Sequence, residues 1–356
     1  MFTATISAQP GPQADFLRSP ADICIYGGAA GGGKTVGLIL EPLRYVSRVP
    51  GFTAAFFRRT TPQITNPGAL WDESRNFYPR LGGTPHLGAR EWRWPRGGKI
   101  KFSHLQFDTT VYDWQGAQIA LICFDELTHF TAHQFFYMVS RNRSTCGVRP
   151  YIRATCNPDA DSWVADFLGW WIDPESGQPI PERAGVLRYY IRVAGQIEWA
   201  DRPEELLQHL PRPEELPPGF ELPRPISVTF IPAKVFDNPA LLRVNPEYLA
   251  WLLSLPLLER ERLLDGNWKI RPAAGRILQL PPNSRSRSSS GSDNSHARYS
   301  GFTRSSAGLS NTVAGMNVTL IGRGASKPGG RSFSPGRYCA KSSGRSAHSI
   351  LPATRM

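Results

Sequence analysis

Paired cysteines, long apolar runs and, near the end of the chain, acidic residues are all scarce in this sequence. The five cysteines show no C-x-x-C spacing, which disfavours both a zinc knuckle and a disulfide framework. The longest apolar segments, such as 119–124, are far too short to span a bilayer. The residues after Met1 lack the basic start and apolar run of a secretory signal. We therefore expect a protein of a reducing cytoplasm that has no membrane association.

The net charge of +12 comes entirely from the end of the chain. Residues 271–356 contain 13 Lys and Arg and one acid, Asp293, whereas residues 1–270 contain 28 basic and 28 acidic residues. Ser, Gly, Arg and Pro dominate the end, and its apolar residues are too sparse for a core. This composition is typical of disorder. We predict an ordered domain over 1–270 and a disordered basic tail over 271–356.

The first 270 residues alternate between strand-like and helix-like patterns. Strands are predicted at 22–26, 53–57, 99–103, 119–125, 151–155 and 228–231, and helices at 34–47, 131–141, 246–253 and 257–264. Asn245 before Pro246 predicts the start of the third helix. Residues 172–225, rich in Pro and Glu, are interpreted as an insertion or hinge. The alternation predicts an α/β fold with a mostly parallel sheet flanked by helices.

A glycine-rich motif lies between the first strand and the first helix. Residues 28–35 read GAAGGGKT, which matches the phosphate-binding pattern G-x-x-x-x-G-K-[ST]. In such a loop the backbone N–H groups surround the phosphates, the lysine reaches the β- and γ-phosphates and the threonine hydroxyl binds Mg²⁺. A flexible strand-to-helix turn is the alternative. The candidate nucleotide-binding residues are Gly28, Gly31, Gly32, Gly33, Lys34 and Thr35.

Two acids end the apolar strand at 119–125. Asp125 is placed to complete the Mg²⁺ shell, as in a Walker B element, and Glu126 to act as the general base toward the attacking water. Such a pair also occurs as a solvated strand end, so the hypothesis depends on the glycine-rich motif. The cofactors predicted are ATP and Mg²⁺, with Lys34, Asp125 and Glu126 as the catalytic residues of a P-loop NTPase.

A polar stretch, ATCNP at 154–158, ends the next strand. Thr155 and Asn157 there could sense the γ-phosphate and transmit its state to moving parts. A simple Asn-Pro turn is the alternative interpretation.

In combination these motifs resemble the large terminase subunits of tailed phages and prophages. The segments that carry the resemblance lie in the expected order at 12–19, 25–35, 57–60, 114–116, 124–127, 154–158, 231–233, 237–239 and 264–268. The resemblance covers roughly residues 10–270. It implies an ATPase motor that moves double-stranded viral DNA into a procapsid in the cytoplasm of the bacterial host. The implied partners are a small terminase subunit, a portal protein and further copies of the chain in a ring.

The resemblance also assigns individual roles. Gln13 would contact adenine, and Thr155 and Asn157 would couple hydrolysis to motion. Some relatives place an arginine inside the glycine-rich loop, but Ala29 and Ala30 occupy that loop here. The candidates for a transition-state arginine are Arg58, Arg59, Arg141 and Arg143, or an arginine from a neighbouring subunit.

The end of the chain departs from the family pattern. Complete large terminases continue with a two-metal nuclease, which needs several converging carboxylates. Residues 271–356 offer only Asp293, so nuclease activity is not expected from this chain, and a frameshift near 275–280 is one hypothesis. A genuine DNA-binding tail is the rival. The alternative functions are another P-loop DNA motor such as a helicase, and an inactive, decayed prophage product.

Overall fold

The computed structural model describes residues 5–217, 223–271 and 318–319. Its helices are α1 (Pro12–Arg18), α2 (Lys34–Leu40), α3 (Pro62–Thr65), α4 (Leu70–Phe77), α5 (Ala132–Val139), α6 (Trp163–Phe167), α7 (Pro239–Val244), α8 (Glu247–Ser254) and α9 (Leu257–Leu263). Its strands are β1 (Thr5–Ile6), β2 (Ile23–Gly28), β3 (Thr53–Arg58), β4 (Thr84–His86), β5 (Glu91–Arg93), β6 (Lys99–His104), β7 (Leu121–Phe124), β8 (Tyr151–Cys156), β9 (Arg188–Val193), β10 (Gln196–Ala200), β11 (Ile226–Ala233) and β12 (Val318–Thr319).

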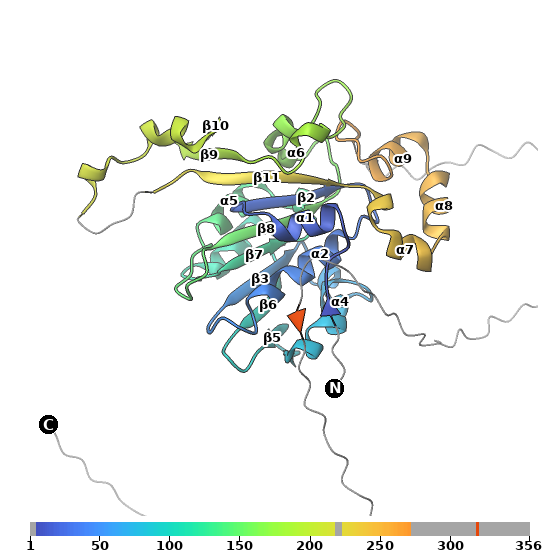
Figure 1. The fold of residues 1–356 in the computed structure, drawn as a ribbon, viewed down its shortest axis with the longest axis horizontal. Coiled ribbons are helices and arrows are strands. Elements are labelled where there is room, and N and C mark those ends of the chain that lie inside the picture. Colours follow the sequence, from blue (N-terminus) through green and yellow to red (C-terminus); the bar gives the residue numbers. More distant parts are fainter. Residues whose placement is uncertain (1–4, 218–222, 272–317, 320–356) are drawn as a thin grey trace, which may run out of the picture. The chain divides into compact units, whose positions relative to one another are not determined.

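A ten-stranded sheet with the order β10-β9-β11-β2-β8-β7-β3-β6-β5-β4 organises the described chain (Figure 1). The six central strands, from β11 to β6, are parallel, and an antiparallel pair extends the sheet at each edge. β1 pairs with β12 in a separate two-stranded sheet. The predicted α/β fold is therefore confirmed, and all six predicted strands lie in the large sheet.

Side-chain alternation along the central strands divides the core into two layers. On β2, Cys24 and Tyr26 pack with α1 and α2 on one face, while Ile23 and Ile25 pack with α5 and α6 on the other. Figure 1 shows these helices on opposite sides of the sheet. Because both faces are covered, the central strands are almost fully apolar, which is why they could be predicted from composition.

The structure adds elements that the sequence patterns did not show. Within 172–225, β9 and β10 form a hairpin that pairs antiparallel with β11. The predicted helix at 34–47 is shorter: α2 ends at Leu40 and a 3₁₀ turn follows at Glu41–Arg44. Asn245 does not cap α8, which begins after Pro246 with no side-chain cap, so that expectation was wrong. The predicted tail at 271–356 lies outside the described residues, apart from Arg271 and β12.

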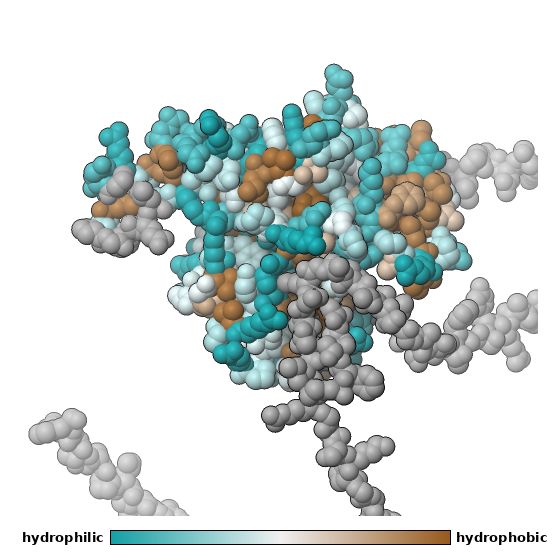
Figure 2. Space-filling model, in the orientation of Figure 1, coloured by the Kyte–Doolittle hydropathy of each residue, from teal (hydrophilic) through white to brown (hydrophobic). Residues whose placement is uncertain are grey.

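No helix in the described ranges is long and apolar enough to cross a membrane. Figure 2 shows apolar surface around α7 to α9, where several large apolar side chains are exposed, namely Val244, Trp251, Leu253, Leu257 and Leu258.

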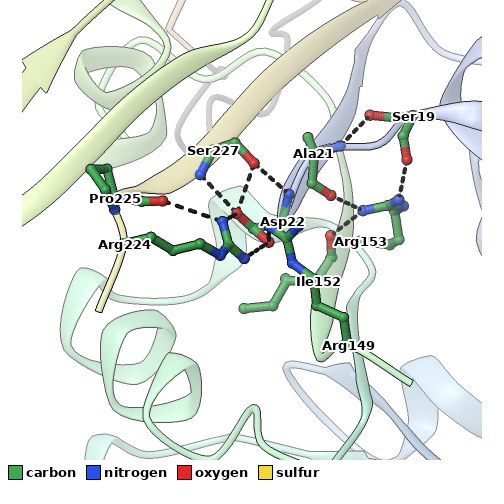
Figure 3. A network of polar contacts seen from close by, with 9 residues as sticks. All are labelled: Ser19, Ala21, Asp22, Arg149, Ile152, Arg153, Arg224, Pro225 and Ser227. Carbon is green, nitrogen blue, oxygen red and sulfur yellow. Dashed lines mark hydrogen bonds and ion pairs between the residues drawn. The ribbon is translucent and has the colours of Figure 1, made fainter. Parts of the chain in front are cut away.

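A buried carboxylate fastens the amino end of the sheet (Figure 3). Asp22, directly before β2, accepts hydrogen bonds from both terminal nitrogens of Arg224, at 2.9 and 2.7 Å, and from Nη2 of Arg149. The backbone N–H and hydroxyl of Ser227 donate to it at 2.9 and 2.7 Å. Burial alone would raise the pKa of Asp22, but the hydrogen bonds from Arg224 and Ser227 outweigh it and leave the pKa below its ordinary value.

This network predicts that the contribution of Asp22 to the free energy of unfolding depends on pH. A carboxylate whose pKa is lowered by folding stabilises the fold above its unfolded pKa of about 3.9, and the contribution is lost as the pH falls through the folded pKa. Asp22→Asn should destabilise the protein by about 1–3 kcal/mol at pH 7. The difference in melting temperature from the unaltered protein should shrink below about pH 4.

Asp201→Asn is the matched control, because Asp201 is exposed and pairs only at the surface with Arg188. Its effect should stay within about 0.5 kcal/mol. An Asp22→Asn penalty that is equally large at pH 7 and pH 3 would show that the ionised carboxylate is not what stabilises this end of the sheet.

Candidate functional site

The loop between β2 and α2 adopts a backbone that glycine alone accommodates well. Gly28, Gly31 and Gly33 have φ angles of 123°, 78° and 73°. A Cβ atom at Gly28 would lie 2.6 Å from the carbonyl oxygen of Ala233. The N–H of Ala29 donates to that same oxygen at 2.8 Å, so β11 supports the loop from beneath. The glycines of the predicted motif are therefore required by the loop geometry itself.

Lys34 begins α2 and lies within the loop. Its side chain is buried, and Nζ donates to the carbonyl oxygens of Gly28, at 3.2 Å, and Ala29. Burial lowers the pKa of Lys34, and the carboxylates of Glu126 and Asp125 act in the opposite direction. The amine is thus held at the loop, where phosphate oxygens would be expected.

Asp125 brings four elements together at the carboxyl edge of the sheet. Its Oδ1 accepts from the hydroxyls of Thr155, at 2.6 Å, and Thr35, at 3.4 Å. The Nε of Arg58, at the end of β3, lies 2.8 Å from Oδ2 in an ion pair. Burial raises the pKa of Asp125, and the charge of Arg58 opposes this effect. The carboxylate therefore links the glycine-rich loop to β3, β7 and β8.

Glu126 follows in a left-handed backbone conformation, with φ 60° and ψ 65°. The backbone N–H of Asn157 donates to Oε2 at 3.2 Å, and its Nδ2 donates to Oε1 and Oε2 at 3.1 and 3.2 Å. The N–H of Glu126 itself donates to Thr155 Oγ1 at 3.3 Å. Residues in this conformation cost about 1–3 kcal/mol and cluster at functional sites. The two predicted coupling residues thus contact the two predicted acids.

Two cavities meet at Glu126 and Asn157. The first has a volume of about 460 Å³ and is lined by 30–36 of the loop, by the two shared residues and by Gly68, Glu73, Asn238, Leu241 and Tyr248. The second, of about 410 Å³, is lined by Arg58, Gln63, Thr128, His129, Pro158, Asp159, Arg262, Leu263 and the same shared pair. The candidate base therefore separates a space beside the phosphate loop from a space beside Arg58.

Of the four arginine candidates, the structure brings Arg58 alone to this site. Arg59 donates from Nη1 to Gln134 Oε1 at 2.8 Å and braces the start of α5. Arg141 and Arg143 lie at the amino end of β7, where the carbonyl of Arg141 bonds Ile119 and the side chain of Arg143 bonds the carbonyls of Gly116 and Ala117. Within one copy of the chain, these three are held away from the acids.

Gln13 lies next to the loop, and its amide is already occupied. Its Nε2 donates to the carbonyl of Gly33 at 2.8 Å, and its Oε1 accepts from the N–H of Gln9 at 2.7 Å. The side chain is buried and does not line either cavity. The adenine contact implied by the resemblance stays a prediction. In the structure the Gln13 side chain supports the glycine-rich loop through its bond to Gly33.

Sequence patterns assigned no role in the site to two further residues that support it, Asn238 and Tyr248. Asn238 donates from Nδ2 to the carbonyl of Gly31 at 2.7 Å, and its Oδ1 accepts from Nε2 of Gln9 at 2.7 Å and from the N–H of Leu241 at 3.3 Å. Tyr248 packs so closely on the loop that a Cβ at Gly31 would lie 2.6 Å from its ring. Asn238 precedes Pro239 at the start of α7, and this cap pattern, within the segment 237–239 that contributes to the resemblance, is the signal that could have identified it.

The comparisons with known proteins point to one family. The family model described as "Terminase large subunit, T4likevirus-type, N-terminal" matches residues 25–281. No curated protein matches the chain.

Three solved structures illustrate the likeness in fold. The large terminase of a thermophilic bacteriophage in complex with ADP is 13% identical with a TM-score of 0.46, over 74% of this chain and 54% of that chain. The ATPase domain of the Thermus phage P74-26 large terminase is 13% identical with a TM-score of 0.44, over 72% and 93%. The N-terminal domain of the DNA packaging ATPase from bacteriophage phi29 is 12% identical with a TM-score of 0.32, over 50% and 88%. The chain thus spans about half the length of the first of these proteins.

The position of Asn238 predicts that it holds the loop in shape. Asn238→Ala removes a helix cap, at about 1 kcal/mol, and the side-chain bonds to Gly31 and Gln9. We expect a lower melting temperature and a several-fold weaker affinity for ADP, measured by calorimetry.

Asn245→Ala is the matched control, because Asn245 also precedes a proline but is exposed and has no side-chain hydrogen bond to another described residue. Equal ADP affinities for the two variants would show that Asn238 does not support the binding loop.

Proposed function

The chain belongs to the terminase large-subunit family, and from this premise we propose that it hydrolyses ATP to translocate double-stranded viral DNA into a procapsid. In this proposal residues 1–270 form the ATPase domain. It works in a homo-oligomeric ring with a portal protein and a small terminase subunit, in the cytoplasm of the bacterial host.

One observation carries the proposal. The hydroxyl of Thr35, in the glycine-rich loop, bonds the carboxylate of Asp125, and Glu126 lines the same cavity as Lys34. A phosphate-binding loop, a metal-binding carboxylate and a candidate base therefore converge at the carboxyl ends of parallel strands, where ligands of open α/β sheets bind. This arrangement suits the transfer of a phosphoryl group to water.

The donor set fits Mg²⁺. Asp125 Oδ2 is buried and has no hydrogen bond from the described residues, and the Thr35 hydroxyl faces the other carboxylate oxygen. Hard oxygen donors of this kind, one carboxylate and one hydroxyl, are typical of the protein's share of a Mg²⁺–nucleotide site. When bound, the ion neutralises charge that develops on the phosphate oxygens. Thr35 and Asp125 would hold it.

Glu126 serves as the general base in this proposal. Its carboxylate is held by the backbone and side chain of Asn157 and borders both cavities. It would orient a water and accept its proton as the bond to the γ-phosphate forms. Lys34 would neutralise the phosphates from the other side of the first cavity. Thr155 and Asn157 would transmit the change in charge, because Thr155 bonds the carboxylate of Asp125 and Asn157 bonds the carboxylate of Glu126.

Two arginines are candidates for the transition-state arginine in this proposal. Arg58 is the one candidate at the site within this copy of the chain, and a neighbouring subunit could supply another through the second cavity. Gln13 would affect adenine binding through the loop that it braces.

Loss of the phosphate-facing amine should weaken nucleotide binding. Lys34→Ala removes a charge-assisted interaction of about 1.5–3 kcal/mol, so the Kd for ATP should rise about ten- to hundredfold. Titration of a fluorescent ATP analogue measures this. Unchanged affinity in a folded variant would show that the glycine-rich loop is not the phosphate site.

Loss of the base should separate binding from turnover. Glu126→Gln should retain ATP binding and lower the turnover rate at least about a hundredfold. The assay uses the full chain with and without double-stranded DNA. Normal turnover in the variant would exclude Glu126 as the base. An unaltered chain that folds but never binds ATP would refute the proposed function as a whole.

A further inference from the structure

The ion pair between Arg58 and Asp125 has an unusual geometry. The two atoms are 2.8 Å apart, yet neither Arg58 Nε nor Asp125 Oδ2 makes a hydrogen bond within the described part of the chain. Buried polar atoms are nearly always hydrogen-bonded, and exceptions call for an explanation. Charge attraction alone therefore holds Arg58 against this carboxylate. Asn157 Oδ1, directly after the end of β8, is likewise buried without a partner among the described residues.

The neighbouring arginine shows the contrast. Arg59 is fixed by hydrogen bonds from Nη1 to Gln134 Oε1, at 2.8 Å, and to the carbonyl of Leu105, at 3.4 Å. The side chain of Arg58 has no polar contact with any described residue besides Asp125. Its side chain is 19% exposed and lines the second cavity, which has a volume of about 410 Å³. Arg58 can therefore leave Asp125 and turn into this space without breaking a hydrogen bond.

Asp125 is also the carboxylate that the proposed function assigns to Mg²⁺. A divalent cation at this carboxylate and a guanidinium 2.8 Å from it repel each other strongly, because the surroundings are buried and screen charge poorly. In that proposal the Thr35 hydroxyl would also hold the ion, whereas no contact joins Arg58 to Thr35 among the described residues. Binding of the metal–nucleotide complex is therefore coupled to departure of Arg58.

We propose that Arg58 is a counter-ion which neutralises the Asp125 carboxylate in the empty site and is displaced into the second cavity when Mg²⁺–nucleotide binds. The inference rests on the proposed function, since it takes Asp125 as a metal ligand. Arg58 is a positioning residue in this scheme. It stabilises the buried acid before ATP arrives, and its release places a positive charge beside Glu126 and Asn157, which line the same cavity.

The test is a titration of the full chain with Mg²⁺ alone, followed by ADP binding in Mg²⁺ and in EDTA, both by calorimetry. Arg58→Ala removes the competing charge, so its affinity for Mg²⁺ should rise about tenfold or more. Arg58→Lys, which keeps a charge, should bind Mg²⁺ much as the unaltered chain does. Arg58→Gln replaces Arg58→Ala if the alanine variant does not fold.

Arg262→Ala is the charge-matched control. Arg262 lines the same cavity but bonds Glu259 and the carbonyl of Pro158. It should leave Mg²⁺ affinity within about twofold, because its charge does not contact Asp125. A similar rise in Mg²⁺ affinity in Arg262→Ala would show that any positive charge lining the cavity weakens Mg²⁺ binding. It would overturn the assignment to Arg58.

The remaining outcomes are equally decisive. Unchanged or weaker Mg²⁺ binding in the uncharged Arg58 variants would overturn the inference, since Arg58 would then orient Asp125 for the metal. If the unaltered chain binds ADP normally, that result leaves the proposed function standing. If the unaltered chain binds no nucleotide in Mg²⁺ or in EDTA, the proposed function fails and this inference fails with it.

Discussion

The buried carboxylate of Asp125 is the interaction on which the rest of the site depends. It lies at the end of β7 with almost no exposure, and it is held by Thr35, Thr155 and Arg58. An ionised carboxylate in such a place is costly unless charge and hydrogen bonds compensate it. Those compensating groups come from the glycine-rich loop, β8 and β3. The need to compensate this one buried charge therefore fixes the spacing of four chain segments, namely the glycine-rich loop and the ends of β3, β7 and β8.

The opposite side of the loop is held by neutral groups instead. Backbone contacts from Ala233, at the end of β11, and Leu263, at the end of α9, reach the N–H groups of Ala29 and Ala30. Asn238 holds the carbonyl of Gly31. Charged groups thus surround Asp125, while uncharged hydrogen bonds fix the loop at Ala29, Ala30 and Gly31.

The sequence revealed the parts of the site that depend on local chemistry. The glycine-rich loop requires positive φ angles, and the buried strands require apolar residues on both faces, so both leave a readable pattern. Contacts between distant segments leave no such pattern in the sequence. Asn238 and Asn245 both precede a proline, yet only the side chain of Asn238 caps the start of a helix, and the same side chain also bonds the distant Gly31 and Gln9. Likewise, nothing local distinguishes Arg58, which faces Asp125, from the arginine that follows it.

The arrangement of the two acids depends on a local departure from strand geometry. Consecutive residues in a strand point to opposite faces, so Asp125 and Glu126 would be separated if β7 simply continued. Thr155 and Asn157 are two positions apart, and extended chain places them on the same side. The left-handed backbone at Glu126 ends the strand and turns its carboxylate toward Asn157. The strain of about 1–3 kcal/mol is offset by three hydrogen bonds from Asn157. A shift of the end of β8 must therefore move both acids together, which would link the proposed hydrolysis mechanically to the sheet.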